Sequence, residues 1–144
     1  MFNVALALSA WERGNLVIKK KSNNDVPTTL DRLEAKLKEN GIAVIARVDH
    51  AAAAAKVDME LRPTQVLFFG NPKLGTPLMQ GSQVVGLELP MRVLAWEDEE
   101  GQTWVTYYSP QTIATTHNVG DRVNVINMLT VALDSLTDFA VASA

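Results

Sequence analysis

The fold of this chain is decided by residues 91–108, MRVLAWEDEEGQTWVTYY. Met91, Val93 and Ala95 alternate with the larger Arg92, Leu94 and Trp96, and residues 103–108 are again rich in β-branched and aromatic types. Four acidic residues and a glycine separate the two runs, so this stretch predicts a β-hairpin with a short, solvated turn. Because neighbouring side chains of a strand point to opposite faces, we expect Tyr107 and Tyr108 on different sides of the sheet.

A strand and a helix are predicted near the start of the chain. Residues 16–18 are apolar and run into three lysines, which is typical of a short strand that ends in solvent. Asp25 suits the N-cap of a helix, and the pair Asn40 and Gly41 is a stop signal. Between these signals apolar residues recur every three or four positions and form one helical stripe. The stripe consists of Val26, Leu30, Leu33 and Leu37.

The middle of the chain predicts two more strands. Residues 42–49 alternate and contain β-branched types, and the alanine run at 51–55 favours a short helical insertion after them. Residues 65–69, QVLFF, form a continuous apolar run, which is typical of a strand at the centre of a sheet or covered on both faces. Residues 73–80 favour a short helix that ends at Gly81.

A long amphipathic helix is predicted at the end of the chain, with Asp121 near its start, where negative charge suits the helix dipole. Its apolar stripe is expected to contain Val125, Leu129, Ala132, Leu136 and Phe139. The complete order is strand, helix, four strands with a short helical insertion, and a closing helix. Helices gathered on one face of a largely antiparallel sheet make an α+β sandwich.

Composition favours one soluble domain and excludes several functions. The chain has 144 residues, a net charge of -3, no cysteine and only two histidines, His50 and His117. Its basic residues are scattered, so we expect no nucleic-acid binding. The histidines lack metal-ligand spacing, and we expect no metal and no cofactor. The sequence does not decide the cellular compartment. The cytoplasm is favoured, and export is the alternative if the natural N-terminus is longer.

The first residues form an apolar extension, residues 1–14, ahead of a single domain at 15–144. The segment FNVALALSA at 2–10 lacks a basic n-region and is far shorter than the ~20 residues of a membrane span. We therefore expect no membrane span. An apolar stretch of this kind is expected to pack on its own domain or on a second copy, and the second copy predicts a homodimer.

One loop after the apolar run at 65–69 has the composition of a ligand site. Two glycines lie at the separation of a P-loop, but the lysine that contacts nucleotide phosphates is missing, so we predict no ATP or GTP hydrolysis. The turn can still offer backbone amides to an anion, and the alternative is a turn that needs glycine and proline only for its backbone angles. The candidate ligand-binding residues are Gly70, Asn71, Pro72, Lys73, Gly75 and Thr76.

His117 completes the candidate site. It is expected in a loop just ahead of the last helix, where its ring would face a cleft that it shares with Asn71. Histidine has a pKa suited to acid–base chemistry near neutrality. A capping or surface role is favoured over catalysis, because no carboxylate or serine partner is found by spacing.

Three motif runs carry a family resemblance. Residues 69–79 (FGNPKLGTPLM), 86–98 (GLELPMRVLAWED) and 104–110 (WVTYYSP) resemble the core pattern of the "domain of unknown function 302" family. The resemblance spans about residues 15–142. It implies a TATA-binding-protein-like fold and frequent homodimers. It implies no activity, so no catalytic residue is carried over.

Three functions follow as hypotheses. The first is a small-molecule or anion-binding module, with its pocket between the loop at 70–76 and His117. The alternative is a homodimeric protein-interaction module without a small ligand. An enzyme that uses His117 comes third.

Overall fold

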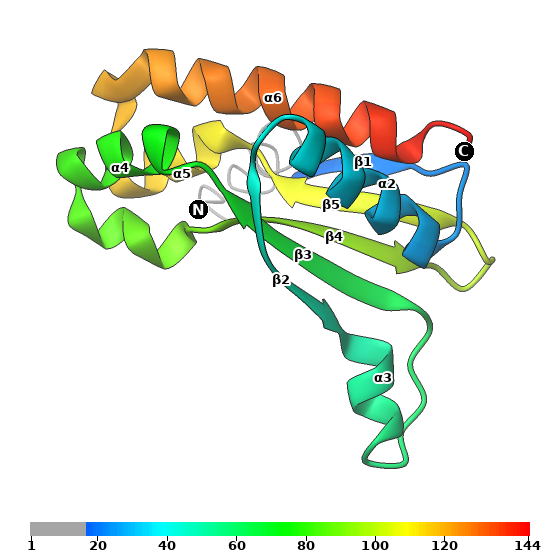
Figure 1. Ribbon diagram of the computed structural model, residues 1–144. Helices are drawn as coiled ribbons and strands as arrows, with labels where there is room; N and C mark the ends of the chain where they lie inside the picture. The colour runs from blue at the N-terminus through cyan, green and yellow to red at the C-terminus, as the bar shows by residue number, and fades with distance from the viewer. Residues whose placement is uncertain (1–16) are drawn as a thin grey trace, which may run out of the picture.

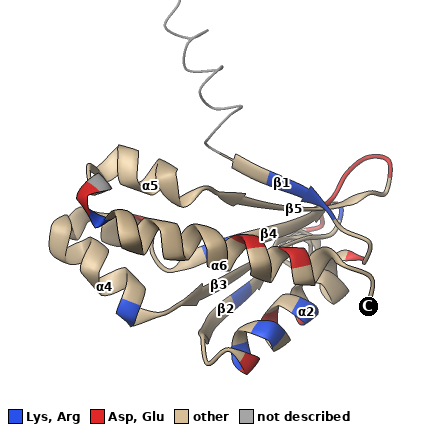
Figure 2. Cartoon of the chain, turned by 90° about the horizontal axis from the view of Figure 1, so that it is seen from above, with Lys and Arg blue, Asp and Glu red and all other residues tan. Residues whose placement is uncertain are grey.

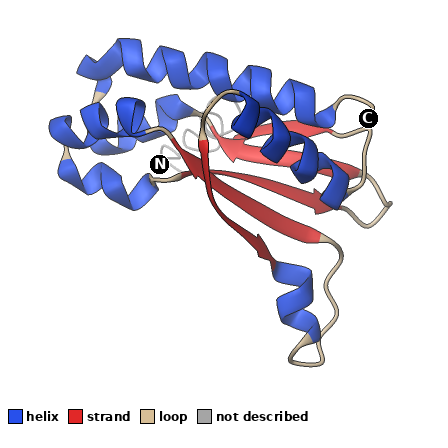
Figure 3. Cartoon of the chain, in the orientation of Figure 1, coloured by secondary structure: helices blue, strands red, loops and turns tan. Residues whose placement is uncertain are grey.

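The structure is a computed structural model that describes residues 17–144, so the apolar extension at 1–14 lies outside the described residues. Its five strands form one antiparallel sheet in the order β1-β5-β4-β3-β2. Helices α2 and α6 lie side by side on one face of this sheet (Figure 1). The predicted α+β sandwich is confirmed, including its order of strand, helix, four strands and closing helix (Figure 3).

The elements have the following bounds. The strands are β1 (Val17–Lys21), β2 (Ala43–Asp49), β3 (Thr64–Gly70), β4 (Met91–Glu97) and β5 (Thr103–Tyr108). The α-helices are α2 (Val26–Glu39), α3 (His50–Ala55), α4 (Pro72–Gly81), α5 (Pro110–His117) and α6 (Val123–Val141). Two 3-10 helices complete the described chain, η1 (Gln83–Glu88) and η2 (Gly120–Arg122).

Helix α2 forms where the sequence predicted it. The Asp25 carboxylate accepts a hydrogen bond from the Thr28 amide at 2.9 Å, which satisfies one of the free donors of the first turn. Past the helix, Gly41 adopts a φ of 72°, a left-handed conformation that suits glycine. The predicted stripe from Val26 to Leu37 is fully buried against the sheet.

The stripe predicted for α6 is corrected by the structure. Leu129 and Leu136 are buried as expected, but the rest of the buried face consists of Ile126, Leu133, Thr137 and Ala140. Phe139, expected inside, is 36% exposed, and its ring lies under the cations of α2. Periodicity alone could not distinguish the two stripes, because α6 carries apolar residues on more than one side and its contact with α2 selects the buried side.

The strand at 65–69 is not the middle strand of the sheet, and the helices within residues 17–144 cover it on one face. The central strand is β4, and β3 lies between β4 and β2. Leu67 and Phe69 of β3 are buried under the helices, while Phe68 on the other face is half-buried. Its apolar run therefore reflects Val66, which is also buried, and Phe68 on the open face, and not a second layer of helices within residues 17–144.

Helix α5 was not predicted. It begins at Pro110, whose ring suits the first helical turn, and it ends at His117, followed by the C-cap Asn118 with a left-handed φ of 54°. It places His117 in its last turn and not in a loop. The helices within residues 17–144 include none long and apolar enough to cross a membrane.

Charged side chains mark one end of the sheet. The lysines of β1 lie beside the acidic turn between β4 and β5 (Figure 2). In that turn, Asp98 accepts hydrogen bonds from the Trp104 indole at 2.8 Å and from the amides of Gln102 and Glu100. These hydrogen bonds lower the pKa of Asp98, and the bond from the Trp104 indole has the largest effect. The acidic residue thus fixes the turn of the predicted hairpin.

Candidate functional site

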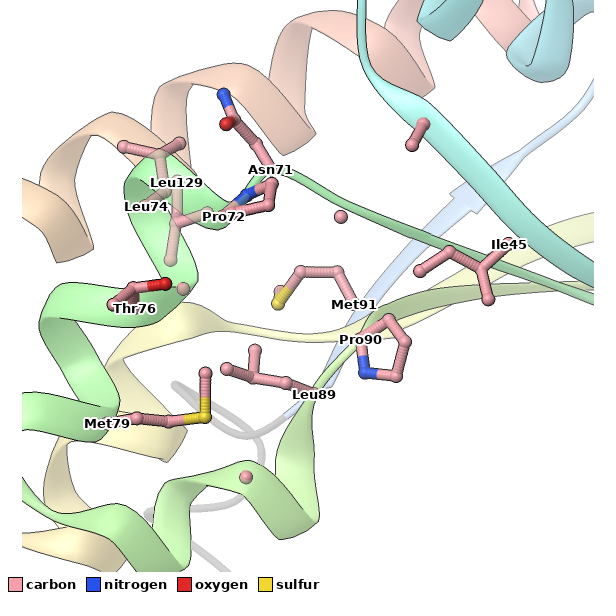
Figure 4. A pocket seen from close by; sticks show the side chains of 14 residues that line it. Ile45, Asn71, Pro72, Leu74, Thr76, Met79, Leu89, Pro90, Met91 and Leu129 are labelled. Atoms are coloured by element: carbon pink, nitrogen blue, oxygen red, sulfur yellow. The ribbon is translucent and has the colours of Figure 1, made fainter.

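A pocket of about 380 Å³ opens where β3 passes into α4. Its walls come from α4, η1, the adjoining ends of β2 and β4, and one residue of α6 (Figure 4). Most of the wall is apolar, with side chains from Ile45, Leu74, Met79, Leu89, Pro90 and Met91. The pocket therefore suits a ligand that is itself largely apolar.

The loop singled out from sequence forms one side of this pocket. The predicted residues that line it are Gly70, Asn71, Pro72, Gly75 and Thr76. Lys73 is exposed and is not part of the wall. The loop is also shorter than expected, because α4 already begins at Pro72.

Asn71 organises the start of α4. Its side-chain oxygen accepts a hydrogen bond from the Lys73 amide at 3.0 Å, and its backbone oxygen accepts from Leu74 at 2.9 Å and from Gly75 at 3.0 Å. Pro72 has no amide hydrogen. The first-turn amides that an anion would use are therefore already bonded within the chain.

Two glycines shape the wall of the pocket. A Cβ atom added at Gly70 would lie 3.8 Å from the Pro90 Cβ and 4.0 Å from the Ile45 Cδ1, which is ordinary contact distance between two walls. A Cβ at Gly75 would lie only 3.3 Å from the Leu89 Cδ1, so glycine there lets α4 approach the segment before β4 closely. A side chain at position 70 would thus occupy the space that a ligand would use.

His117 does not line this pocket, so the shared concavity with Asn71 is not found there. Its side chain is only 10% exposed, and its Nε2 lies 3.0 Å from the Glu88 Oε2. Helix α5 carries it to η1, where Glu88 is the last residue. The physical reason for the difference is that residues 110–117 form a helix, which holds the His117 ring against Glu88.

The partner of His117 was missed by spacing because Glu88 is 29 residues away in sequence. The other oxygen of Glu88, Oε1, lies 3.4 Å from Nη2 of Arg92, so one carboxylate bridges a histidine and an arginine. Glu88 and Arg92 lie four residues apart on either side of Pro90, and no sequence motif signals that pairing.

Comparisons with known proteins place the chain in a family. Residues 18–136 match the family model described as "Domain of unknown function DUF302". A solved structure, "Crystal structure of uncharacterized conserved protein DUF302 from Bacillus stearothermophilus", superposes with a TM-score of 0.77 at 18% identity. The match covers 86% of this chain and 97% of that one, and at this identity it shows the fold alone.

Curated relatives carry the name "Fluoride-specific ion channel". The protein called FluC 1 in Brucella suis biovar 1 is 42% identical over 104 residues, which is 72% of this chain and 41% of the relative. The FluC 1 protein of Brucella abortus biovar 1 is also 42% identical over 104 residues, 38% of its length. The chain therefore spans about two-fifths of the length of these relatives.

Proposed function

Because this chain belongs to the family described as domain of unknown function DUF302, which names no activity, we propose a function from the geometry of the chain itself. The protein is a small-molecule-binding module whose ligand occupies the pocket between α4, η1 and the ends of β2, β3 and β4. One observation carries the proposal: the pocket of about 380 Å³ falls within the size range of ligand sites and is lined by the loop that the sequence singled out.

The wall chemistry defines the ligand class. Met79 and Met91 contribute flexible thioethers that adapt to the shape of an apolar body. Asn71 and Thr76 contribute the polar side chains of the wall. A compact apolar molecule with a single hydroxyl or carbonyl group fits this distribution.

An anion has less support than a neutral ligand. The described wall of the pocket includes no Lys or Arg, and the amides of Lys73, Leu74 and Gly75 already have acceptors. Fluoride, which the names of the relatives suggest, is strongly hydrated and would need such donors. Fluoride is therefore the control ligand for this pocket.

Methionine-methyl NMR tests the proposal directly. Adding 1-hexanol should shift the methyl signals of Met79 and Met91, while the exposed Met59 and Met128 stay unchanged as internal controls. Sodium fluoride should shift none of the four. Equal shifts at all four methionines on adding 1-hexanol would contradict a defined pocket.

A pocket-filling variant sharpens the same experiment. Gly70→Leu places a side chain between Ile45 and Pro90 and should abolish the hexanol-induced shifts. The matched control is Ala46→Leu, which enlarges an exposed residue of β2 outside the pocket and should leave the shifts intact. Shifts that survive in Gly70→Leu would place the ligand elsewhere.

A second candidate function is that of a homodimeric interaction module. The segment between β2 and β3, including α3, projects from the body as an arm (Figure 1). Three large apolar side chains on this arm are exposed, Val57 at 65%, Met59 at 66% and Leu61 at 49%. Such exposed apolar side chains favour burial against a partner, and most soluble oligomers are formed by copies of one chain.

Light scattering tests the dimer. The full chain should run as a dimer at micromolar concentration, and Met59→Ser combined with Leu61→Ser should shift it towards monomer. Met128→Ser, on the outer side of α6, is the control and should leave the dimer intact. A monomeric full chain contradicts this candidate. Loss of the dimer in a variant lacking residues 1–14 would assign the contact to that extension and not to the arm.

The enzyme hypothesis has the least support. The Nε2 atom of His117 is engaged by Glu88, and the ring is nearly buried. The Glu88 carboxylate is a partner that spacing did not reveal, but with only 10% of the side chain exposed the ring offers a substrate little access.

A further inference from the structure

The face of the sheet that no helix of residues 17–144 covers carries a second hollow, of about 350 Å³. It crosses the strands, and its floor includes Val66, Phe68 and Leu94. The registers place Val66 opposite Leu94 and Phe68 opposite Arg92, so an apolar floor runs directly up to a guanidinium group. We call this hollow the sheet groove. It shares no lining residue with the pocket beside α4.

Arg92 has hydrogen-bonding capacity left over. Within residues 17–144 its one ion pair is to Glu88, at a long 3.4 Å, and its side chain is 40% exposed. A guanidinium offers five N–H donors, and Glu88 divides its two oxygens between Arg92 and His117. Arg92 is therefore able to receive a second carboxylate side-on, the geometry in which it binds most strongly.

The surroundings of Arg92 favour a negative head group. Tyr108 also lines the groove, is 49% exposed and brings a phenolic hydroxyl. On the same face, the Lys19 ammonium lies over the rings of Trp96 and Trp104, at 5.0 and 4.2 Å from their centroids. Lys19 beside Asp98 and Arg92 beside Glu88 thus place cations on a face whose floor is apolar, and Arg92 is the cation that lines the groove.

From these observations we propose that the sheet groove binds a small amphipathic carboxylate, with its carboxylate on Arg92 and its hydrocarbon part on Phe68, Leu94 and Val66. The volume is at the lower end of the range for ligand sites, about 300–1,000 Å³, which limits the ligand to a medium-chain or single-ring acid. This site is independent of the one proposed beside α4.

Calorimetric titration with octanoate, against 1-octanol as the uncharged control, tests the proposal. Octanoate should bind, and Arg92→Gln should weaken it about tenfold, the usual effect of losing a charge-assisted hydrogen bond. Arg92→Lys keeps the positive charge but loses the planar guanidinium with its paired N–H donors, and it should weaken octanoate binding less than Arg92→Gln does. Lys73→Gln removes an exposed cation outside the groove and should have no effect.

Glu88→Gln gives a test that damage to the fold cannot imitate. Removing the carboxylate that competes for Arg92 should tighten octanoate binding several-fold. Gly70→Leu should leave octanoate binding unchanged, which separates this site from the pocket beside α4.

Three results would overturn the proposal. One is octanoate binding that is equal in the wild type and in Arg92→Gln. Another is octanol binding as tight as octanoate binding. The third is a set of Phe68 and Leu94 NMR signals that respond to protein concentration and not to octanoate, which would assign the groove to a second copy of the chain.

Discussion

The two faces of the sheet are built from the same strands but have different surroundings. On the covered face, Val93, Ala95 and Val105 are fully buried under α2 and α6. On the open face, Leu94, Trp96 and Thr106 alternate with them along the same strands and are only partly buried. The comparison teaches that one face holds the domain together, while apolar residues on the other remain available for recognition.

The largest expected difference in the free energy of unfolding is between alanine substitutions of two leucines on opposite faces of the sheet. Leu67→Ala removes a fully buried side chain under the helices and should lower the free energy of unfolding by about 2–5 kcal/mol. Leu94→Ala, on the adjacent strand but on the open face, should cost less than about 1.5 kcal/mol. Urea denaturation of both variants measures the difference. Equal losses would show that the open face is also covered in solution.

The helix caps allow a second comparison. Asp25 caps α2, which covers the sheet, and Asp49 caps α3, which buries none of its residues. Asp25→Ala should destabilise the domain by about 1 kcal/mol, because the cap of a packed helix contributes to global unfolding. Asp49→Ala should leave the urea midpoint almost unchanged and should increase only local amide exchange in α3. Asp49 also accepts a hydrogen bond from Gln65 of β3 at 3.3 Å, so a larger global loss that Gln65→Ala does not reproduce would mean that the arm is packed against something.

The smallest expected effect is a pH dependence on the covered side of β1. The Lys20 ammonium hydrogen-bonds Asp134 and Asp138 of α6, each at 2.8 Å. Burial lowers its pKa, but the bonds to the two carboxylates outweigh burial, so the pKa lies above the ordinary 10.5. A raised pKa in the folded state gives stability that is present below the unfolded pKa and lost as pH rises through the folded one.

Lys20→Met should therefore remove part of the stability loss seen above pH 10.5. Because the carboxylates are well exposed, the difference should be about 1 kcal/mol or less. Lys19→Met, its neighbour on the open face, is the control and should keep the alkaline loss. Thermal unfolding at pH 8 to 11 measures this loss of stability. An equal loss in Lys20→Met and in the wild type would rule out a contribution from Lys20.

Sequence reasoning located part of the candidate site. Glycine, asparagine and proline after an apolar strand marked the passage from strand to helix, where Gly70 ends β3 and Asn71 caps α4, and both residues line the pocket. The same reasoning assigned an anion-binding role to amides that α4 uses itself, because the bounds of α4 decide which amides remain free. The sheet groove had no sequence signal, since its residues are contributed by separate strands.

The sequence by itself determined the local elements of this protein. The α2 stripe, its Asp25 cap and the alternation that separates Tyr107 from Tyr108 all follow from side-chain spacing within a few residues. Only the tertiary structure decided which stripe of α6 is buried, that β4 lies at the centre of the sheet, and that His117 meets Glu88. These features depend on contacts between residues far apart in the chain, and local periodicity carries no information about which distant surface will cover a given face.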